Sequence, residues 1–227
     1  MTRFKRILST LAVGTALAAT AGQAAPPNSQ TVPVTHVVGD PKADVRLVEY
    51  VSYTCSHCAD FEVEAGELIK LAYVSSTDLA VEIRHIVRDP VDMTVALLAH
   101  CGDADRFSAN HHALMRSQKA WIGAISATSE AQHRRYDTGT LAARYRAIAG
   151  DAGLYEIMEK RGYSAGQVDR CLDNEPLARA LASATRDYVD NGVKGTPSFS
   201  FGGEMLHGVH TWAALKPELD KRVRKGK

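Results

Sequence analysis

The sequence lacks the features that mark several large protein classes. It has 27 Lys and Arg against 26 Asp and Glu and no basic stripe with interleaved aromatic side chains, which argues against nucleic-acid binding. No nucleotide- or flavin-binding motif is present. A single Cys-x-x-Cys pair occurs, and no second pair of closely spaced Cys or His residues completes a tetrahedral metal site. We therefore expect no bound metal, no organic cofactor and no nucleic-acid partner.

The apolar run at the N-terminus, Ile7 to Ala19, is shorter than the roughly 20 residues that a transmembrane helix needs. Three cations precede it and small residues follow it, which is typical of a secretory signal peptide. We expect cleavage after Ala24, with cleavage after Ala21 or an uncleaved anchor as alternatives. Removing residues 1–24 takes three of the 27 basic residues and no acidic ones, which leaves 24 against 26. The mature chain is expected in an exported compartment, where disulfides persist.

The Cys-x-x-Cys pair, Cys55 and Cys58, follows an almost continuously apolar run from Val45 to Tyr53, which predicts a strand buried on both faces. We place Cys55 at a helix N-terminus, where unpaired N–H groups and a partial positive charge stabilise a thiolate. His57, when protonated, would add a positive charge, and Cys58 is expected to be the more buried cysteine. The apolar stripe of this helix is predicted to comprise Phe61, Ala65, Leu68 and Ala72.

We interpret Cys55 and Cys58 as a redox-active pair, because one Cys-x-x-Cys supplies only half of a zinc site. A purely structural disulfide and a metal site are the alternatives. His111 and His112 are adjacent and would point apart on a helix, so we interpret them as polar surface residues.

The remaining patterns predict an α/β fold. Val34 to Val38 is consistent with a short edge strand, and the alternation from Leu79 to Val87 predicts a strand parallel to the buried one in a βαβ unit. Residues 90–174 show helical patterns without a strand pattern, and within them the polar stretch Ser126 to Thr140 is interpreted as a loop. The end of the chain is predicted to form a helix, a hairpin and a last helix: Glu175 to Asp190, Ser198 to His207, and Thr211 to Val223.

These elements predict a division of the mature chain into three parts. Residues 25–33 are interpreted as a disordered leader. Residues 34–89 and 175–227 would form a discontinuous sheet domain, and residues 90–174 a helical insertion.

Taken in this order, the features resemble the thioredoxin superfamily, and within it the DsbA-like periplasmic thiol:disulfide oxidoreductases. The resemblance rests on the exported N-terminus, the strand that runs into the Cys-x-x-Cys helix, the helical insertion, and Gly195-Thr196-Pro197 before the closing hairpin. It covers nearly the whole mature chain. It implies a thioredoxin-like fold, a mixed central sheet flanked by helices with an inserted helical subdomain, and a periplasmic location.

The resemblance also implies roles for single residues. Cys55 matches the family's exposed nucleophile and Cys58 its disulfide partner, while His57 matches the histidine found between them. Pro197 matches a cis-proline that faces the disulfide and leaves the backbone around Thr196 free to pair with a substrate strand. Ser56, Thr196 and Pro197 are accordingly the predicted substrate-binding positions.

Two acids complete the implied site. Glu49 lies six residues before Cys55, where DsbA-like proteins carry a buried acid that manages the proton of the inner cysteine. Glu62 matches a second acid of the family, with a solvated helix residue as the alternative interpretation.

Two positions depart from the best-known oxidases. Ser56 stands where they carry proline, so their redox potential does not carry over. Thr196 before the proline resembles both some oxidases and the isomerase branch.

Cys101 and Cys171 lie 70 positions apart in the predicted helical insertion. In an exported protein with an even number of cysteines, a structural disulfide between them is the simplest interpretation. Two buried free thiols are the alternative.

From the resemblance we expect an enzyme that donates the Cys55-Cys58 disulfide to exported polypeptides, using no cofactor beyond that disulfide. We expect a monomer and a membrane partner that re-oxidises it. A disulfide isomerase or reductase is the first rival, although about 20 residues of mature chain before the first core strand are too few for a separate dimerisation domain. A non-catalytic peptide-binding module is the second.

Overall fold

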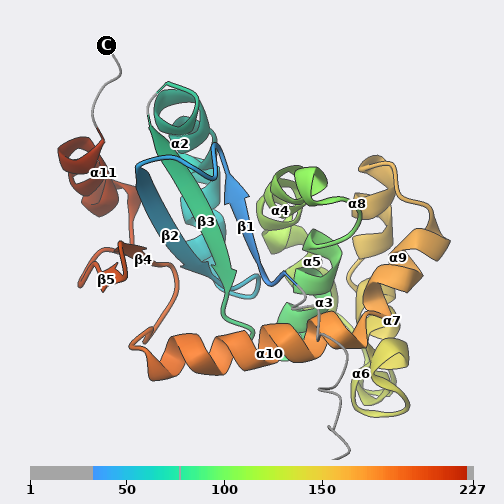
Figure 1. The fold of residues 1–227 in the computed structure, drawn as a ribbon. Coiled ribbons are helices and arrows are strands. Elements are labelled where there is room, and N and C mark those ends of the chain that lie inside the picture. The colour runs from blue at the N-terminus through green and yellow to red at the C-terminus, as the bar shows by residue number, and fades with distance from the viewer. Residues whose placement is uncertain (1–32, 77, 224–227) are drawn as a thin grey trace, which may run out of the picture. The chain divides into compact units, whose positions relative to one another are not determined.

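A mixed five-stranded sheet organises the structure, with strand order β1-β3-β2-β4-β5 (Figure 1). The structure is a computed structural model and describes residues 33–76 and 78–223. The signal peptide predicted for residues 1–24 and nearly all of the predicted leader lie outside the described residues. β2 pairs in parallel with β3 and antiparallel with β4, and the two outer pairings are antiparallel. The strands are β1 Thr35–Val38, β2 Val45–Val51, β3 Leu79–His85, β4 Ser198–Phe201 and β5 Glu204–Met205.

The central position of β2 follows from its sequence. Its residues from Leu47 to Val51 are all buried, which a strand with a neighbour on each side and a layer on each face requires. The parallel pairing with β3 confirms the predicted βαβ unit, and β1 confirms the predicted edge strand. The sequence prediction of an α/β fold with a mixed sheet is therefore confirmed.

The helix after the cysteines buries a different set of residues from the predicted apolar stripe. Phe61 and Ala65 are buried as expected, but Leu68 is 50% exposed and Ala72 is exposed as well. Two π-helical segments widen the helix, so its buried face follows a spacing of four residues and continues through Ile69 and Tyr73. The consecutive segments are α1 Ser56–Phe61, η1 Glu62–Gly66, α2 Glu67–Ile69 and η2 Lys70–Val74.

The described residues between β3 and α10 form only helices and their connections, gathered beside β1 (Figure 1). The predicted loop at Ser126 to Thr140 is wrong, because a helix occupies most of it. Ser129 and Gln132 form a capping box that starts this helix, a signal that the polar composition concealed. These helices are α3 Pro90–Ala99, η3 Ala104–Arg106, α4 Phe107–Arg116, α5 Gln118–Ser126, α6 Glu130–Asp137, α7 Leu141–Asp151, α8 Leu154–Lys160 and α9 Ala165–Leu172.

The long helix α10 (Glu175–Asp190) leads from the helical region back to the sheet (Figure 1). Asn174 caps it as predicted, and Thr185 ties it to the end of β3 by accepting the N–H of Val87 at 3.0 Å. The last helix, α11 (Trp212–Arg222), buries Leu215 and Leu219. None of the helices within residues 33–76 and 78–223 is long and apolar enough to cross a membrane.

The described residues belong to one compact unit that includes both the sheet and the helices beside it. A single hydrophobic cluster joins core residues of β2 and β3 to those of α3, α4 and α7. The division into a sheet domain and an insertion at residues 90–174 stays a prediction.

Candidate active site

The two cysteines occupy the start of α1. Cys55 is the N-cap, in extended conformation, and its carbonyl accepts the N–H of Cys58 at 3.2 Å. Both thiols are free, and Cys55 is 7% exposed against 1% for Cys58. Cys55 therefore presents its sulfur at the helix N-terminus, whereas Cys58 lies inside the first turn, as the sequence predicted.

The loop before β4 closes the site on the other side. The Thr196–Pro197 peptide bond is cis, as the resemblance implies. The thiol of Cys55 donates to the carbonyl of Thr196 over 3.2 Å, although 141 positions separate the two residues. The antiparallel pairing of β4 with β2 produces this approach, because it carries the start of β4 to the end of β2 where α1 begins.

The two sulfurs have opposite acid–base properties. The hydrogen bond with the Cys58 thiol is the largest influence on Cys55 and lowers its pKa to about 5. The side chain of Thr196 and the charge of Arg88 act in the same direction, and burial opposes them. Burial, followed by the contact with Cys55, raises the pKa of Cys58 far above its ordinary range. Cys55 is therefore a thiolate at neutral pH and Cys58 a thiol.

His57 and Ser56 are both exposed beside the cysteines. The cation that acts on Cys55 is Arg88, which the sequence analysis did not single out. The positive charge proposed for His57 and the substrate contact proposed for Ser56 stay predictions.

A buried carboxyl group at the start of α3 holds the loop between β2 and α1. Asp92 accepts the hydroxyl of Ser52 at 2.5 Å and the backbone N–H of Tyr53 at 2.9 Å. Gln118 donates to the carbonyls of Tyr53 and Cys55 at 2.6 and 2.8 Å. Asp92 and Gln118 therefore hold the segment that carries Cys55, and no local pattern in the sequence indicates that they approach it.

Glu49 lies in the middle of β2, opposite Ile83 of β3 and Phe199 of β4. It is buried, as predicted. Burial is the main reason that its pKa rises to about 8, and the nearby charge of Glu62 adds to the effect. Glu49 is therefore a neutral acid at pH values where other glutamates are ionised.

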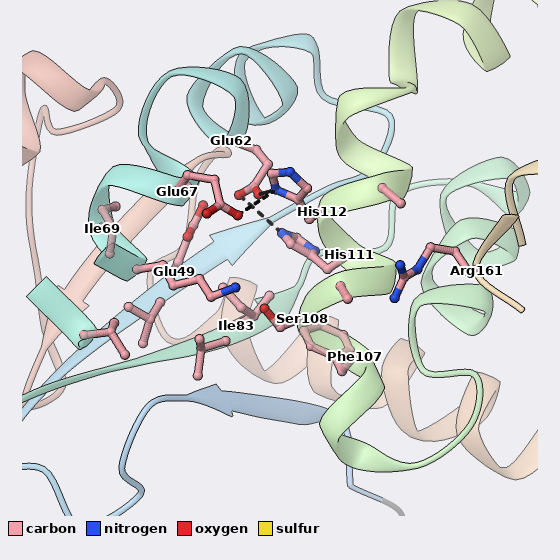
Figure 2. Close-up of a pocket in the computed structure, with 17 residues that line it drawn as sticks. Glu49, Glu62, Glu67, Ile69, Ile83, Phe107, Ser108, His111, His112 and Arg161 are labelled. Carbon is pink, nitrogen blue, oxygen red and sulfur yellow. Dashed lines mark hydrogen bonds and ion pairs between the residues drawn. The ribbon is translucent and has the colours of Figure 1, made fainter. Parts of the chain in front are cut away.

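Glu62 is also buried, so its interpretation as a solvated helix residue is wrong. Its carboxylate lies 2.7 Å from Nδ1 of His112 and 3.8 Å from Nε2 of His111. Figure 2 shows both imidazoles reaching the Glu62 carboxylate from α4. Glu49 and Glu67 line the same cavity of about 230 Å³.

The prediction that His111 and His112 are surface residues is wrong. His111 is 5% exposed and His112 is half-buried. The expectation that the two imidazoles point apart is also wrong, because α4 packs against η1 and both imidazoles approach the Glu62 carboxylate.

Cys101 and Cys171 form a disulfide with a Cα–Cα distance of 5.4 Å, which confirms the predicted pairing. It joins the chain just after α3 to α9 and takes no part in the Cys55–Cys58 site.

Within the part of the chain that the structure describes, no group of three or more His, Cys, Asp or Glu side chains is placed to bind a metal ion. The expectation of a site without metal or organic cofactor stays a prediction.

Comparisons with known proteins agree with this geometry. A family model described as Thioredoxin matches residues 31–221. Two curated relatives with the provisional name protein-disulfide oxidoreductase come from Rickettsia felis, 26% identical over 84% of this chain, and Rickettsia typhi, 28% identical over 74%. The chain spans 61% and 54% of their lengths, respectively.

Two solved structures show the same fold. A crystal structure described as protein-disulfide isomerase from Novosphingobium aromaticivorans is 46% identical, with a TM-score of 0.79, and the match covers 83% of this chain and 97% of that one. The α-DsbA1 structure from Wolbachia pipientis is 19% identical, with a TM-score of 0.66, over 84% of this chain and 91% of that one. The second likeness concerns the fold alone.

Proposed function

The chain belongs to the thioredoxin family, and from this membership we propose that it is a DsbA-like protein-disulfide oxidoreductase that donates the Cys55–Cys58 disulfide to exported proteins. The observation that carries the proposal is the contrast between the two sulfurs. A thiolate at the helix N-terminus beside a buried thiol makes the reduced pair stable, and a stable reduced pair makes its disulfide a strong oxidant.

In the first step, a substrate thiolate attacks Sγ of Cys55 in the oxidised protein. The Cys55–Cys58 bond breaks, and its electron pair leaves on the Cys58 sulfur. Because the pKa of Cys58 is raised, this sulfur needs a proton as it leaves. Glu49, a neutral acid with a pKa of about 8, is the group that we propose supplies it.

In the second step, another thiolate of the substrate attacks the substrate sulfur of the mixed disulfide. Cys55 departs as a thiolate, which its low pKa makes a good leaving group. The substrate dithiol has then lost two electrons and gained a disulfide, and the Cys55–Cys58 pair is reduced. A membrane oxidant would restore the disulfide, and we place the reaction in the periplasm.

The backbone at Thr196 supports binding of an extended substrate segment. Its carbonyl already contacts Cys55, and an extended peptide alongside it would present a cysteine to the nucleophile. Substrates with different side chains could bind in this way, because the contacts are made by backbone groups.

A disulfide isomerase is the second candidate function. The observation in its favour is the 46% identical Novosphingobium aromaticivorans protein, which is described as a protein-disulfide isomerase. An isomerase would act with Cys55 reduced, so the two functions differ in the redox state that starts the cycle.

The test uses a peptide with two cysteines and three forms of the protein. Oxidised wild type should convert the reduced peptide to its disulfide in a one-to-one reaction, and Cys55→Ser should not react. The matched variant Cys58→Ser keeps the nucleophile and should accumulate a mixed disulfide with the oxidised peptide. Equal activity of Cys55→Ser and wild type would refute the proposal, whereas turnover of a scrambled protein by the reduced form alone would favour the isomerase.

A further inference from the structure

A row of hydrogen-bonded aromatic polar side chains runs through the protein from β1 to α4, and its last member lies 3.8 Å from Glu62. Nε2 of His36 lies 3.0 Å from Nδ1 of His100, and Nε2 of His100 lies 3.3 Å from Nδ1 of His85. Nε2 of His85 lies 3.2 Å from the phenol oxygen of Tyr53, and that oxygen lies 2.8 Å from Nδ1 of His111. We call this set the imidazole chain, and in order it comprises His36, His100, His85, Tyr53 and His111.

The imidazole chain is buried in its middle and open at one end. Tyr53, His85 and His111 are all buried, while His36 and His100 are partly exposed. Its members come from five separate segments of the fold, so no local motif brings them together. Buried imidazoles are costly unless their nitrogens are paired, and each interior member of the chain is paired on both sides.

Glu62 gives the imidazole chain one direction. Nε2 of His111 lies 3.8 Å from the carboxylate, which accepts only, so we assign the hydrogen to this nitrogen, and Nδ1 of His111 then accepts from Tyr53. The phenol oxygen then accepts from Nε2–H of His85. In the same way, Nδ1 of His85 accepts from Nε2–H of His100, and Nδ1 of His100 accepts from Nε2–H of His36. All four imidazoles therefore carry their hydrogen on Nε2, and every donor in the chain points toward Glu62.

The imidazoles of the chain are neutral. Burial is the first cause that lowers the pKa of each, to about 4 for His36 and about 3 for His100, and in the same direction for His85 and His111. A neutral imidazole has one donor and one acceptor, which is what passing a proton along a row requires.

We propose that the imidazole chain conducts protons between solvent at His36 and Glu62, and thereby serves the proton transfer at Glu49. This inference rests on the proposed function, because Glu49 needs a proton each time that it gives one to Cys58. The ring nitrogens and the phenol oxygen of the imidazole chain form the proton path. The chain delivers protons to Glu62 and does not contact the Cys58 sulfur in the proposed step.

The cavity between Glu62 and Glu49 supplies the last part of the path. Both carboxyl groups line its volume of about 230 Å³, and a water molecule takes about 30 Å³, so it has room for several waters. Other titratable groups line this cavity or interact with Glu62. Glu67 of α2 and Lys70 of η2 line the cavity, and His111 and His112 of α4 lie 3.8 and 2.7 Å from the Glu62 carboxylate. The charge of Glu62 acts on Glu49 of β2 and on Tyr53 of the loop before α1.

The transfer balances at each step. A proton from solvent binds Nδ1 of His36, and the hydrogen on its Nε2 moves to Nδ1 of His100. The same exchange repeats through His85, Tyr53 and His111, and the hydrogen on Nε2 of His111 passes to Glu62 across the contact of 3.8 Å when the side chains close it. One proton enters, one reaches Glu62, and each member is left as a neutral group. The reverse transfer, which releases a proton from Glu49 when Cys58 is re-oxidised, restores the original tautomers.

The decisive variant is Tyr53→Phe, which removes the hydroxyl in the middle of the chain and keeps the buried ring. Its matched control is Tyr163→Phe, because Tyr163 is also buried and its hydroxyl donates to the carbonyl of Cys101, which is not a member of the chain. His36→Gln is a second variant that interrupts the chain at its exposed end. The measurements are the rates of reduction of the Cys55–Cys58 disulfide by dithiothreitol and of its re-formation, together with the equilibrium constant.

A conduit changes both rates and leaves the equilibrium unchanged. We expect Tyr53→Phe to slow reduction and re-oxidation equally by about tenfold, less than the 10²- to 10⁴-fold typical of a positioned acid or base, because His112 gives Glu62 a second contact near solvent. His36→Gln should slow both rates in the same manner, and Tyr163→Phe should slow neither. Wild-type rates in both chain variants, or a change in the equilibrium constant as large as the change in one rate, would overturn the inference.

Nitrogen NMR of the wild-type imidazoles provides a test that needs no variant. In the oxidised protein, before a proton has passed, the conduit requires His36, His85, His100 and His111 to carry hydrogen on Nε2, and a mixture of tautomers along the chain in that state would contradict it. A wild-type protein that exchanges with no thiol would refute the proposed function instead, so the two failures are distinguishable.

Discussion

Replacing the buried acid by its neutral isostere, Glu49→Gln, should stabilise the folded protein in a way that depends on pH. Glu49 has a folded pKa of about 8 against an ordinary value of 4.5, so the folded state holds this proton more tightly than the unfolded chain does. The stability that comes from the bound proton is fully present below the ordinary pKa and is lost as pH rises toward the folded pKa. Between about pH 5 and about pH 7.5 the wild type should lose about 3 kcal/mol that the glutamine variant, which does not titrate, keeps.

The assay is urea unfolding of wild type and Glu49→Gln at the two pH values, both in the oxidised form so that Cys55 and Cys58 do not titrate. Any fixed cost of burying the amide cancels in the comparison between pH values. Glu64→Gln, at an exposed position of η1, is the control and should follow the wild type. If the gap between wild type and Glu49→Gln stays constant across this pH range, Glu49 is not held neutral and its assigned part in proton transfer is wrong.

Two further predictions concern the cysteines. Replacing both Cys101 and Cys171 by alanine should lower the free energy of unfolding by about 4 kcal/mol, because the disulfide closes a loop of 70 positions, and an unchanged urea midpoint would contradict this. Arg88→Gln should reduce the stabilisation of the Cys55 thiolate by about 0.5 kcal/mol, a small effect because Arg88 is half-exposed. The ultraviolet absorbance of the thiolate as a function of pH measures this change, with Arg179→Gln as the control.

The sequence predicts the geometry of the site well where the signal is local. A buried strand followed by Cys-x-x-Cys places Cys55 at the helix N-cap, and the structure has it there. Pairing of Cys101 with Cys171 and the cis bond before Pro197 also agree with expectation. The first follows from a local pattern, whereas the disulfide follows from the even number of cysteines in an exported chain and the cis bond from the family resemblance.

The sequence predicts poorly where geometry depends on distant segments. The helix after Cys58 contains wide π-helical turns, so a spacing of 3.6 residues puts Leu68 on the wrong face. His111 is polar and next to another histidine, which favours a surface position until α4 is seen against η1 and β1. The contact of Cys55 with Thr196 and the imidazole chain both join residues far apart in the sequence, and only the folded chain shows them.

The central claim is that the Cys55–Cys58 pair is an oxidant, and its equilibrium with glutathione tests it most directly. We expect a reduction potential of the Cys55–Cys58 pair above about −180 mV. We also expect the Cys55 thiolate to persist well below neutral pH, as a pKa of about 5 requires. A potential near about −270 mV with a Cys55 pKa close to neutral would contradict it and would identify a reductase or isomerase.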